Sequence, residues 1–383
     1  MSLSVCLWAD TLGYPQGGGH TWVFLNWALG LRALGCRVVW LEAADTRRPV
    51  SEVQALAAAL KDRLEPYDLA SSLALCPSAT QPLPRLEGYL DFDDAAQADL
   101  LLNLSYQGSA ELVGRFRRSA LIDIDPGLLQ VWISEGDIEL AQHHTYFSIG
   151  ETVGQPGARF SSAGLNWHYT PPCVALEWWP VCRAPQNAPF TTVTHWRSSR
   201  EWVCQGEESY PNDKRSGFLP FLDLPRHTNQ PLELALCQAA DSDLHLDPDE
   251  EEERRALQER GWHVRHSFAV AATPWDYQKY IQNSRGEFSC VKPSCIRLQN
   301  AWISDRTLCY LASGKPAVIQ HTGASRFLPD GAGLFRFHDL QQAAGFLESV
   351  AADYDRQCLL ARALAEEYFD AQKVIAKILE RAL

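Results

Sequence analysis

YPQGGGHTWVFLNWALGLRALGCRVVWLE, residues 14–42, places three glycines and a histidine between a short apolar run at residues 3–9 and a long amphipathic segment. Apolar side chains recur at helical spacing over residues 21–35, and Gly35 is suited to end that helix. Residues 36–42 have the composition of a buried strand. A strand, a glycine-rich loop, a helix and a second strand predict a parallel sheet with helices on both faces.

The same alternation continues through the first half of the chain. Residues 99–105 and 119–126 are apolar and rich in strand-forming side chains, and helical patterns occupy residues 51–64, with Ser51 as N-cap, and 109–118. At residues 166–189 the alternation stops in a segment rich in proline and tryptophan. Such a segment is typical of a linker between domains.

Beyond this segment the alternation restarts. Strands are predicted at residues 190–196, 232–237, 262–270, 286–291 and 315–323, and helices at 250–261, 273–284, 304–314 and over most of 341–383. The acidic run at 247–253 is expected to form a solvated first helical turn, because carboxylates favour a helix N-terminus. The chain is therefore predicted to be α/β, with two Rossmann-like doubly wound domains, 1–183 and 184–365, facing a central cleft. A last helix, 366–383, would pack back on the first domain.

Composition narrows the class of protein. A length of 383 residues suits two domains, and a net charge of −13 with a pI near 5.3 argues against a nucleic-acid partner, which would require a basic face. No apolar run reaches the roughly 18–20 residues of a membrane-spanning helix, and the start lacks a signal-peptide pattern, so we expect a cytoplasmic protein without a membrane span. The eleven scattered cysteines show no zinc-binding spacing and are expected to be buried thiols.

The glycine-rich loop is the first candidate for ligand binding. Gly17, Gly18 and Gly19 follow a predicted strand, where the backbone of a doubly wound sheet can approach an anionic phosphate or carboxylate. The alternative is a turn that needs positive φ. His20 is either a general base in the cleft or a helix-start residue bonded to backbone. The loop is not GxGxxG, and Glu42 is a poor match to the acidic residue of a dinucleotide site.

Cations follow several predicted strands of the second half. Arg306, next to the helix N-cap Ser304, carries a fork of N–H donors that matches diphosphate oxygens. Lys214 and Lys292 are further phosphate cations, although each charge alone is also typical of an exposed surface. Strand-end residues and one helix neighbour complete the predicted binding set: His195, Arg197, Thr307, Thr322 and Gly323.

Asp123 and Asp125 occupy IDIDPG, at the end of a predicted strand of the first half. In one interpretation they orient an acceptor or support His20, and we carry all three as catalytic candidates. In the other they cap a strand-to-loop turn.

Two stretches, YLASGKPAVIQHTG at 310–323 and FLPDGAGLFRF at 327–337, resemble GT-B glycosyltransferases of the group 1 type, nearer to the spore-protein-like and uncharacterised bacterial branches. Most of the likeness lies in residues 287–369, and ALIDIDPGLLQ and YFSIGETVG of the first half share it. The resemblance implies a nucleotide-sugar bound mainly by the second domain, an acceptor bound mainly by the first, and chemistry in the cleft. It implies that Gly17–Gly19 meet the diphosphate or sugar, that Arg306 and Lys214 meet phosphate, and that His20 occupies the base position of inverting members.

The sequence departs from that family at its acidic positions. The glutamate that holds the nucleotide ribose is replaced by Cys309, and Glu287 is the one residue that matches the glutamate pair of many retaining members. The resemblance therefore leaves the nucleotide base and the stereochemical outcome open.

Three hypotheses account for these residues. The leading one is a glycosyltransferase that moves a sugar from a nucleotide-diphosphate sugar to an unidentified acceptor, with cations and helix N-termini stabilising the leaving group and with no metal or cofactor. The second is a catalytically degenerate GT-B protein that binds a nucleotide-sugar or a partner. The third is a nucleotide-dependent oxidoreductase, in which the glycine loop forms a dinucleotide site.

Overall fold

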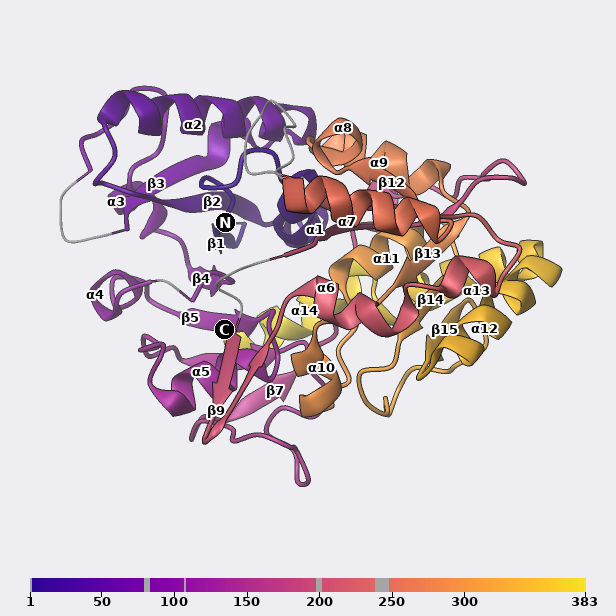
Figure 1. Ribbon diagram of the computed structural model, residues 1–383. Coiled ribbons are helices and arrows are strands. Elements are labelled where there is room, and N and C mark those ends of the chain that lie inside the picture. Colours follow the sequence, from indigo (N-terminus) through magenta and orange to yellow (C-terminus); the bar gives the residue numbers. More distant parts are fainter. Residues whose placement is uncertain (1, 79–82, 107, 198–201, 238–247) are drawn as a thin grey trace.

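The computed structural model describes residues 2–78, 83–106, 108–197, 202–237 and 248–383. Within these ranges the strands form two separate parallel sheets, one in each half of the chain (Figure 1). The first sheet contains β1 Ser4–Ala9, β2 Arg37–Ala44, β3 Leu73–Pro77, β4 Leu100–Asn103, β5 Ser119–Asp123, β6 Thr145–Ser148 and β7 Trp167–Tyr169. The second contains β8 Phe190–His195, β11 Leu232–Cys237, β12 His263–His266, β13 Gly286–Ser289, β14 Ala317–Gln320 and β15 Leu334–Phe337. A separate antiparallel hairpin is formed by β9 Trp202–Gln205 and β10 Glu208–Pro211.

Helices connect the strands and cover the sheets. The helices of the first half are α1 Gly18–Ala33, α2 Val50–Leu64, α3 Phe92–Ala95, α4 Ala110–Val113 and α5 Leu128–Glu135. Those that follow are α6 Lys214–Phe218, α7 Pro248–Glu259, α8 Phe268–Ala271, α9 Pro274–Asn283, α10 Pro293–Leu298, α11 Asp305–Ala312, α12 Leu340–Ala352, α13 Tyr354–Tyr368 and α14 Ala371–Ala382.

Both sheets have the strand order of a doubly wound fold. The order is β3-β2-β1-β4-β5-β6-β7 in the first sheet and β12-β11-β8-β13-β14-β15 in the second. Chain order therefore reverses beside β1 in one sheet and beside β8 in the other, and ligands of such sheets bind at the carboxyl ends of the strands at that reversal. The predicted α/β architecture of two Rossmann-like units is confirmed.

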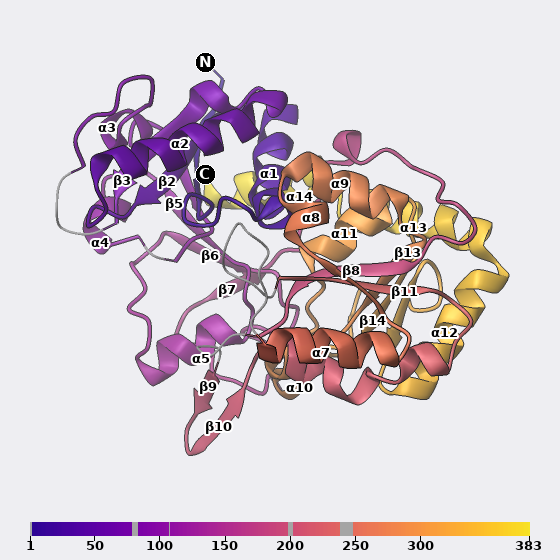
Figure 2. The same cartoon turned by 45° about the horizontal axis from the view of Figure 1, so that its top comes forward.

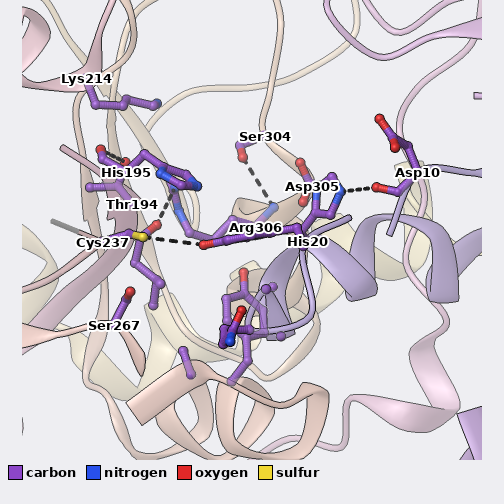
Figure 3. Close-up of a pocket in the computed structure, with 18 of the residues that line it drawn as sticks. Asp10, His20, Thr194, His195, Lys214, Cys237, Ser267, Ser304, Asp305 and Arg306 are labelled. Carbon is purple, nitrogen blue, oxygen red and sulfur yellow. Dashed lines mark hydrogen bonds between the residues drawn. The ribbon is translucent and has the colours of Figure 1, made fainter. Parts of the chain in front are cut away.

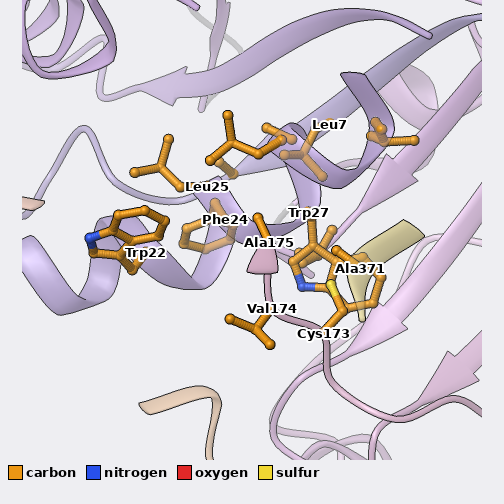
Figure 4. Close-up of a cluster of buried hydrophobic side chains, with 14 of the residues drawn as sticks. Leu7, Trp22, Phe24, Leu25, Trp27, Cys173, Val174, Ala175 and Ala371 are labelled. Atoms are coloured by element: carbon orange, nitrogen blue, oxygen red, sulfur yellow. The ribbon is translucent and has the colours of Figure 1, made fainter. Parts of the chain in front are cut away.

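The hydrophobic core joins the two halves. Alternate residues of β1 face opposite sides: Leu7 belongs to the largest buried cluster, and Trp8 belongs to the cluster on the other face. The largest cluster continues from the first sheet through α1 into α11, α13 and α14. Figure 4 shows the α1 part of this cluster, with Trp27 drawn next to Cys173 and Ala371. A Cβ on Gly30 would lie 2.6 Å from the Cβ of Ala371, so α14 packs closely against α1 (Figure 2).

Several elements differ from the sequence prediction. The proline-rich segment is not only a linker, because Trp167–Tyr169 forms the edge strand β7 of the first sheet. The strand predicted at 262–270 ends at His266, and the apolar run after it is helix α8, since so short a run has no distinguishing period. The strands of the first sheet end at Tyr169 and those of the second begin at Phe190, and the domain limits at 183/184 and 365/366 stay a proposal.

Other expectations hold. The acidic run does open a helix, with Asp249, Glu250 and Glu251 in the first turn of α7. All eleven cysteines are free thiols, and most are buried. In the part of the chain that the structure describes, no helix is both long enough and apolar enough to cross a bilayer.

Candidate functional site

A cavity of about 600 Å³ lies between the two halves (Figure 3). One wall is the loop after β1 and the first turn of α1. The other wall is formed by the ends of β8 and β11 and by the N-termini of α6, α10 and α11. Nine residues predicted from the sequence line it: Gly17, Gly18, Gly19, His20, His195, Lys214, Lys292, Ser304 and Arg306. The glycine-rich loop and the arginine of α11, far apart in the sequence, therefore face one common space.

The three glycines are needed for close packing within and between the halves. None of them has positive φ, so the interpretation as a left-handed turn is wrong. A Cβ on Gly18 would lie well under 3.0 Å from the carbonyl oxygens of Ala271 and Thr273, and one on Gly19 would lie 2.6 Å from the Tyr277 ring. Both obstacles belong to α8 and α9 of the second half. Glycine therefore lets α1 begin directly against the opposite half while leaving its first N–H groups at the cavity.

His20 both contacts backbone and lines the cavity. Its Nε2 lies 2.5 Å from the carbonyl oxygen of Asp10. Because a carbonyl oxygen only accepts hydrogen bonds, Nε2 carries the proton in this arrangement and Nδ1 is the nitrogen that can accept one. The ring is held edge-to-face against Phe24, at 5.4 Å between centroids.

Two carboxyl groups accompany His20 in the cavity, Asp10 and Asp305. Burial raises the pKa of Asp10, and the charge of His20 opposes that rise. Burial also raises the pKa of Asp305, against the effects of Arg306 and of His20. Figure 3 shows Asp10, His20 and Asp305 together on the side of the cavity opposite Lys214.

Arg306 is fixed by a buried ion pair. Its Nε donates to Oε1 of Glu287 at 2.8 Å, and its Nη1 donates to the carbonyl oxygen of Val193 at 3.0 Å. The Arg306 side chain is 11% exposed and that of Glu287 is 0% exposed. The backbone N–H of Arg306 donates to Oγ of the N-cap Ser304 at 3.3 Å, as the sequence predicts. The guanidinium is therefore held at the cavity rather than free to move with solvent.

Lys214 and Lys292 line the cavity together with Arg306, and we call these three cations the positive wall. Lys214 is the first residue of α6, and its Nζ donates to the carbonyl oxygen of Cys290 at 3.1 Å. Burial, and then the nearby Arg306, lower the pKa of Lys214 to about 8. Lys292 is the N-cap of α10. An anion in the cavity would meet three cationic side chains and the N-terminus of α11.

Other predicted binding residues lie away from the cavity. Arg197 pairs with Glu253 of α7 at 2.8 Å, and Glu287 acts through Arg306 from a fully buried position. Thr307 is enclosed inside α11, and the Thr322 hydroxyl donates to the carbonyl oxygen of Trp302 at 2.6 Å. Gly323, with φ of +136°, packs against the backbone at Gln299. None of these five residues lines the cavity, and their part in ligand binding stays a prediction.

Asp123 and Asp125 also do not line the cavity. Oδ2 of Asp123 accepts from Gln130 Nε2 and Ser148 Oγ, and Asp125 accepts from the Tyr106 hydroxyl at 2.7 Å. Asp123 Oδ1 accepts the backbone N–H of Asp125 at 3.0 Å, which is the capped strand-to-loop turn. These contacts match the alternative drawn from the sequence, a capped turn, and neither aspartate lines the cavity with His20. A role of either aspartate toward an acceptor stays a prediction.

Some cavity residues were not identified from the sequence. Tyr14, Cys237 and Ser267 line the space, as do Asp10 and Asp305. Asp10 directly follows strand β1, Cys237 is the last residue of strand β11, and Asp305 lies between the predicted site residues Ser304 and Arg306. Position at a strand end or helix start was the available signal. Within the described residues, His, Cys, Asp and Glu side chains form no group of three or more that could hold a metal ion.

Comparisons with known proteins bear on the fold. No protein-family model matches the chain, and no curated protein matches it by sequence. Solved structures do. An alpha-glucosyltransferase in complex with UDP is 10% identical, with a TM-score of 0.61 and complete coverage of both chains. Sucrose-phosphate synthase from Thermosynechococcus elongatus is 12% identical, with a TM-score of 0.54, over 99% of this chain and 98% of that one.

A third structure, HepE from Anabaena in complex with UDP and glucose, is 13% identical, with a TM-score of 0.56 over 99% of both chains. The alpha-glucosyltransferase is also known in complex with UDP-glucose and DNA. Two doubly wound units with a cavity between them, and full-length similarity to these glycosyltransferases, establish the GT-B fold for this chain.

Proposed function

We propose that this protein is a glycosyltransferase that binds a nucleoside-diphosphate sugar in the cavity between its halves and transfers the glycosyl group to an acceptor. The observation that supports this most is the convergence of Lys214, Lys292, Arg306 and the N-terminus of α11 on one space, opposite the glycine-rich start of α1. The similar alpha-glucosyltransferase structures contain UDP or UDP-glucose, so UDP is the nucleotide to test first.

The chemistry that this arrangement favours is stabilisation of the leaving group. A departing nucleoside diphosphate gains negative charge, and preorganised cations and amide groups lower the energy of that charge in a site shielded from water. Arg306 is already held by Glu287, so little reorganisation is needed when charge develops. His20, with Nδ1 as the accepting nitrogen, is the proposed base for the acceptor hydroxyl, and Asp10 and Asp305 beside it stabilise the imidazolium that forms.

The alternative within the same fold is a protein that binds a nucleotide-sugar without transfer. The resemblance implies a ribose-binding glutamate at the position of Cys309, and its absence favours this alternative. The Cys309 side chain is buried against Asn26 and does not take the place of that glutamate. The oxidoreductase hypothesis requires an acidic residue for the dinucleotide site. Glu42 is not suited to that role, because its carboxylate is buried and accepts hydrogen bonds from the backbone of Thr11 and Leu12. Metal independence and the absence of a nucleic-acid partner stay predictions.

The test begins with binding. We expect UDP to raise the melting temperature of the full-length protein, because a ligand of the folded form stabilises it. Lys292→Ala should reduce that shift, and Arg255→Ala, which removes an exposed cation of α7, should not. No shift with any nucleoside diphosphate would contradict the proposal.

Transfer is tested separately, by the release of UDP from UDP-sugars with and without EDTA. Release in EDTA supports a metal-independent transferase, and release that requires added Mn²⁺ would contradict metal independence. Binding without release, across a panel of sugars and acceptors, supports the non-catalytic alternative. A nicotinamide or flavin absorbance in the purified protein would support the oxidoreductase.

A further inference from the structure

One cysteine differs from the other ten in its surroundings. Cys237 is the last residue of β11, and His195 is the last residue of the neighbouring parallel strand β8. The two are directly paired across the sheet, so both side chains emerge at the carboxyl edge and line the cavity. Figure 3 shows them next to each other, with Ser267 below.

Polar groups from both halves surround the thiol. The Tyr14 hydroxyl, from the loop after β1, lies 3.4 Å from Sγ of Cys237, and the Tyr14 and His195 rings are 5.4 Å apart between centroids. Burial opposes ionisation of the thiol, but hydrogen bonds from His195, Tyr14 and Ser267 outweigh it and hold the pKa of Cys237 below its ordinary value. Burial raises the pKa of Tyr14, and its contact with Cys237 adds to that rise.

The other cysteines provide the contrast. Burial raises the pKa of Cys6, Cys290 and Cys309, whose side chains are almost fully enclosed by the protein. Cys204, on the β9–β10 hairpin, is exposed and has a serine hydroxyl as its hydrogen-bond partner, at 3.7 Å. Reactivity of a cysteine requires both thiolate character and access, and Cys237 combines them in a cavity.

We propose that Cys237 is a nucleophilic thiolate of the cavity and a covalent modification site for soft carbon electrophiles, whose adduct fills the space next to Lys214 and Arg306. In the step, Sγ attacks the electrophilic carbon and a C–S bond forms. The leaving group departs with its bonding electrons, as iodide when the reagent is iodoacetamide, and the thiol proton has already passed to solvent. An adduct at this position excludes an anionic ligand from the positive wall.

The experiment is alkylation of the folded, full-length protein by iodoacetamide between pH 6 and 9, with adducts assigned by peptide mass analysis. We expect the rate at Cys237 to reach half its maximum at a pH below the value of about 8.5 typical of a free thiol. His195→Asn and Tyr14→Phe should each move the Cys237 profile to higher pH. Tyr14→Phe removes only the hydroxyl and keeps the ring. The proposal can therefore still be tested with this variant if His195→Asn does not fold.

Either of two results would overturn the proposal. One is a Cys237 rate that reaches half its maximum at or above a pH of about 8.5, and the other is a pair of variant profiles that match the profile of the unmodified protein. The exclusion of ligand rests on the proposed function and is measured apart from reactivity. Saturating UDP should slow alkylation of Cys237 at least about tenfold and leave Cys204 unaffected. UDP that binds by thermal shift without protecting Cys237 contradicts the exclusion. UDP that does not bind contradicts the proposed function and leaves the pH profile to decide the reactivity.

Discussion

The two halves of this molecule bury carboxylates in different ways. In the first half, Glu42 accepts hydrogen bonds from Thr11, Leu12 and Trp40, and Asp123 accepts from Gln130 and Ser148, all of them neutral donors. In the second half, the buried Glu287 pairs with a cation, Arg306. Burial raises the pKa of Glu42 and of Asp123 to about 7. Glu42 and Asp123 therefore resist ionisation, whereas the charge of Glu287 is compensated by a cation.

The same difference appears in the cavity walls. The wall from the first half contains glycines, Tyr14 and His20 but no lysine or arginine, whereas the second half supplies Lys214, Lys292 and Arg306. Glu287 does not line the cavity, but its carboxylate holds the Arg306 guanidinium in position at the cavity wall. The glycines of the first half allow the backbone to approach the opposite half closely, and the second half contributes the positive charges.

The largest effect should come from breaking the compensated pair. Arg306→Ala leaves Glu287 buried and unpaired, and we expect the free energy of unfolding to fall by about 3–5 kcal/mol, measured by urea titration. Adding Glu287→Gln removes the isolated charge and should restore a substantial part of the loss. A single variant within about 1 kcal/mol of the original protein would show that the pair does not hold this half together.

The next largest effect is the pH dependence of the free energy of unfolding that the buried Asp123 carboxyl causes. Asp123 has an ordinary pKa of 3.8, which burial raises to about 7 in the folded protein. Between these values the folded state holds a proton that the unfolded state releases. The free energy of unfolding therefore falls by about 4 kcal/mol as pH rises through this window, and it levels off above the window. Asp123→Asn should flatten the slope, whereas Asp62→Asn, at an exposed site on α2, should not. Identical slopes in both variants would exclude Asp123 as the titrating group.

The contact between the halves gives a smaller effect. Gly18→Ala forces a Cβ onto the backbone of α8 and the residues before α9, and we expect a loss of about 1–3 kcal/mol in thermal or urea unfolding. Gly13→Ala is the matched control in the same loop, because a Cβ there meets nothing within 4 Å. Equal effects of the two substitutions would mean that the start of α1 does not need its glycine for packing.

The smallest effect concerns charge in the positive wall. Because burial and Arg306 lower the pKa of Lys214 to about 8, the affinity for UDP should fall about tenfold between pH 7 and pH 9 as the lysine loses its proton. Lys214→Arg keeps the charge over this range and should remove most of the fall, as measured by titration calorimetry. An equally steep fall in the arginine variant would assign the pH dependence to another group.

The sequence was sufficient for the fold and for part of the site. Periodicity and glycine placement predict the doubly wound halves, and position at a strand end or helix start identifies His195, Lys214 and Arg306. Periodicity does not identify β3, β6 and β15, because each has only four or five residues and so short a run shows no clear period. The glycine requirement also escapes sequence reasoning, since the atoms that forbid a Cβ on Gly18 lie more than 250 residues away along the chain.

Helix α14 follows α1 by more than 300 residues along the chain, yet its apolar side chains pack against the surface of α1. During synthesis on the ribosome, the face of α1 that α14 covers is therefore made long before its partner. A chain that stops before α14 would leave this apolar face exposed, and exposed apolar surface of this kind favours aggregation.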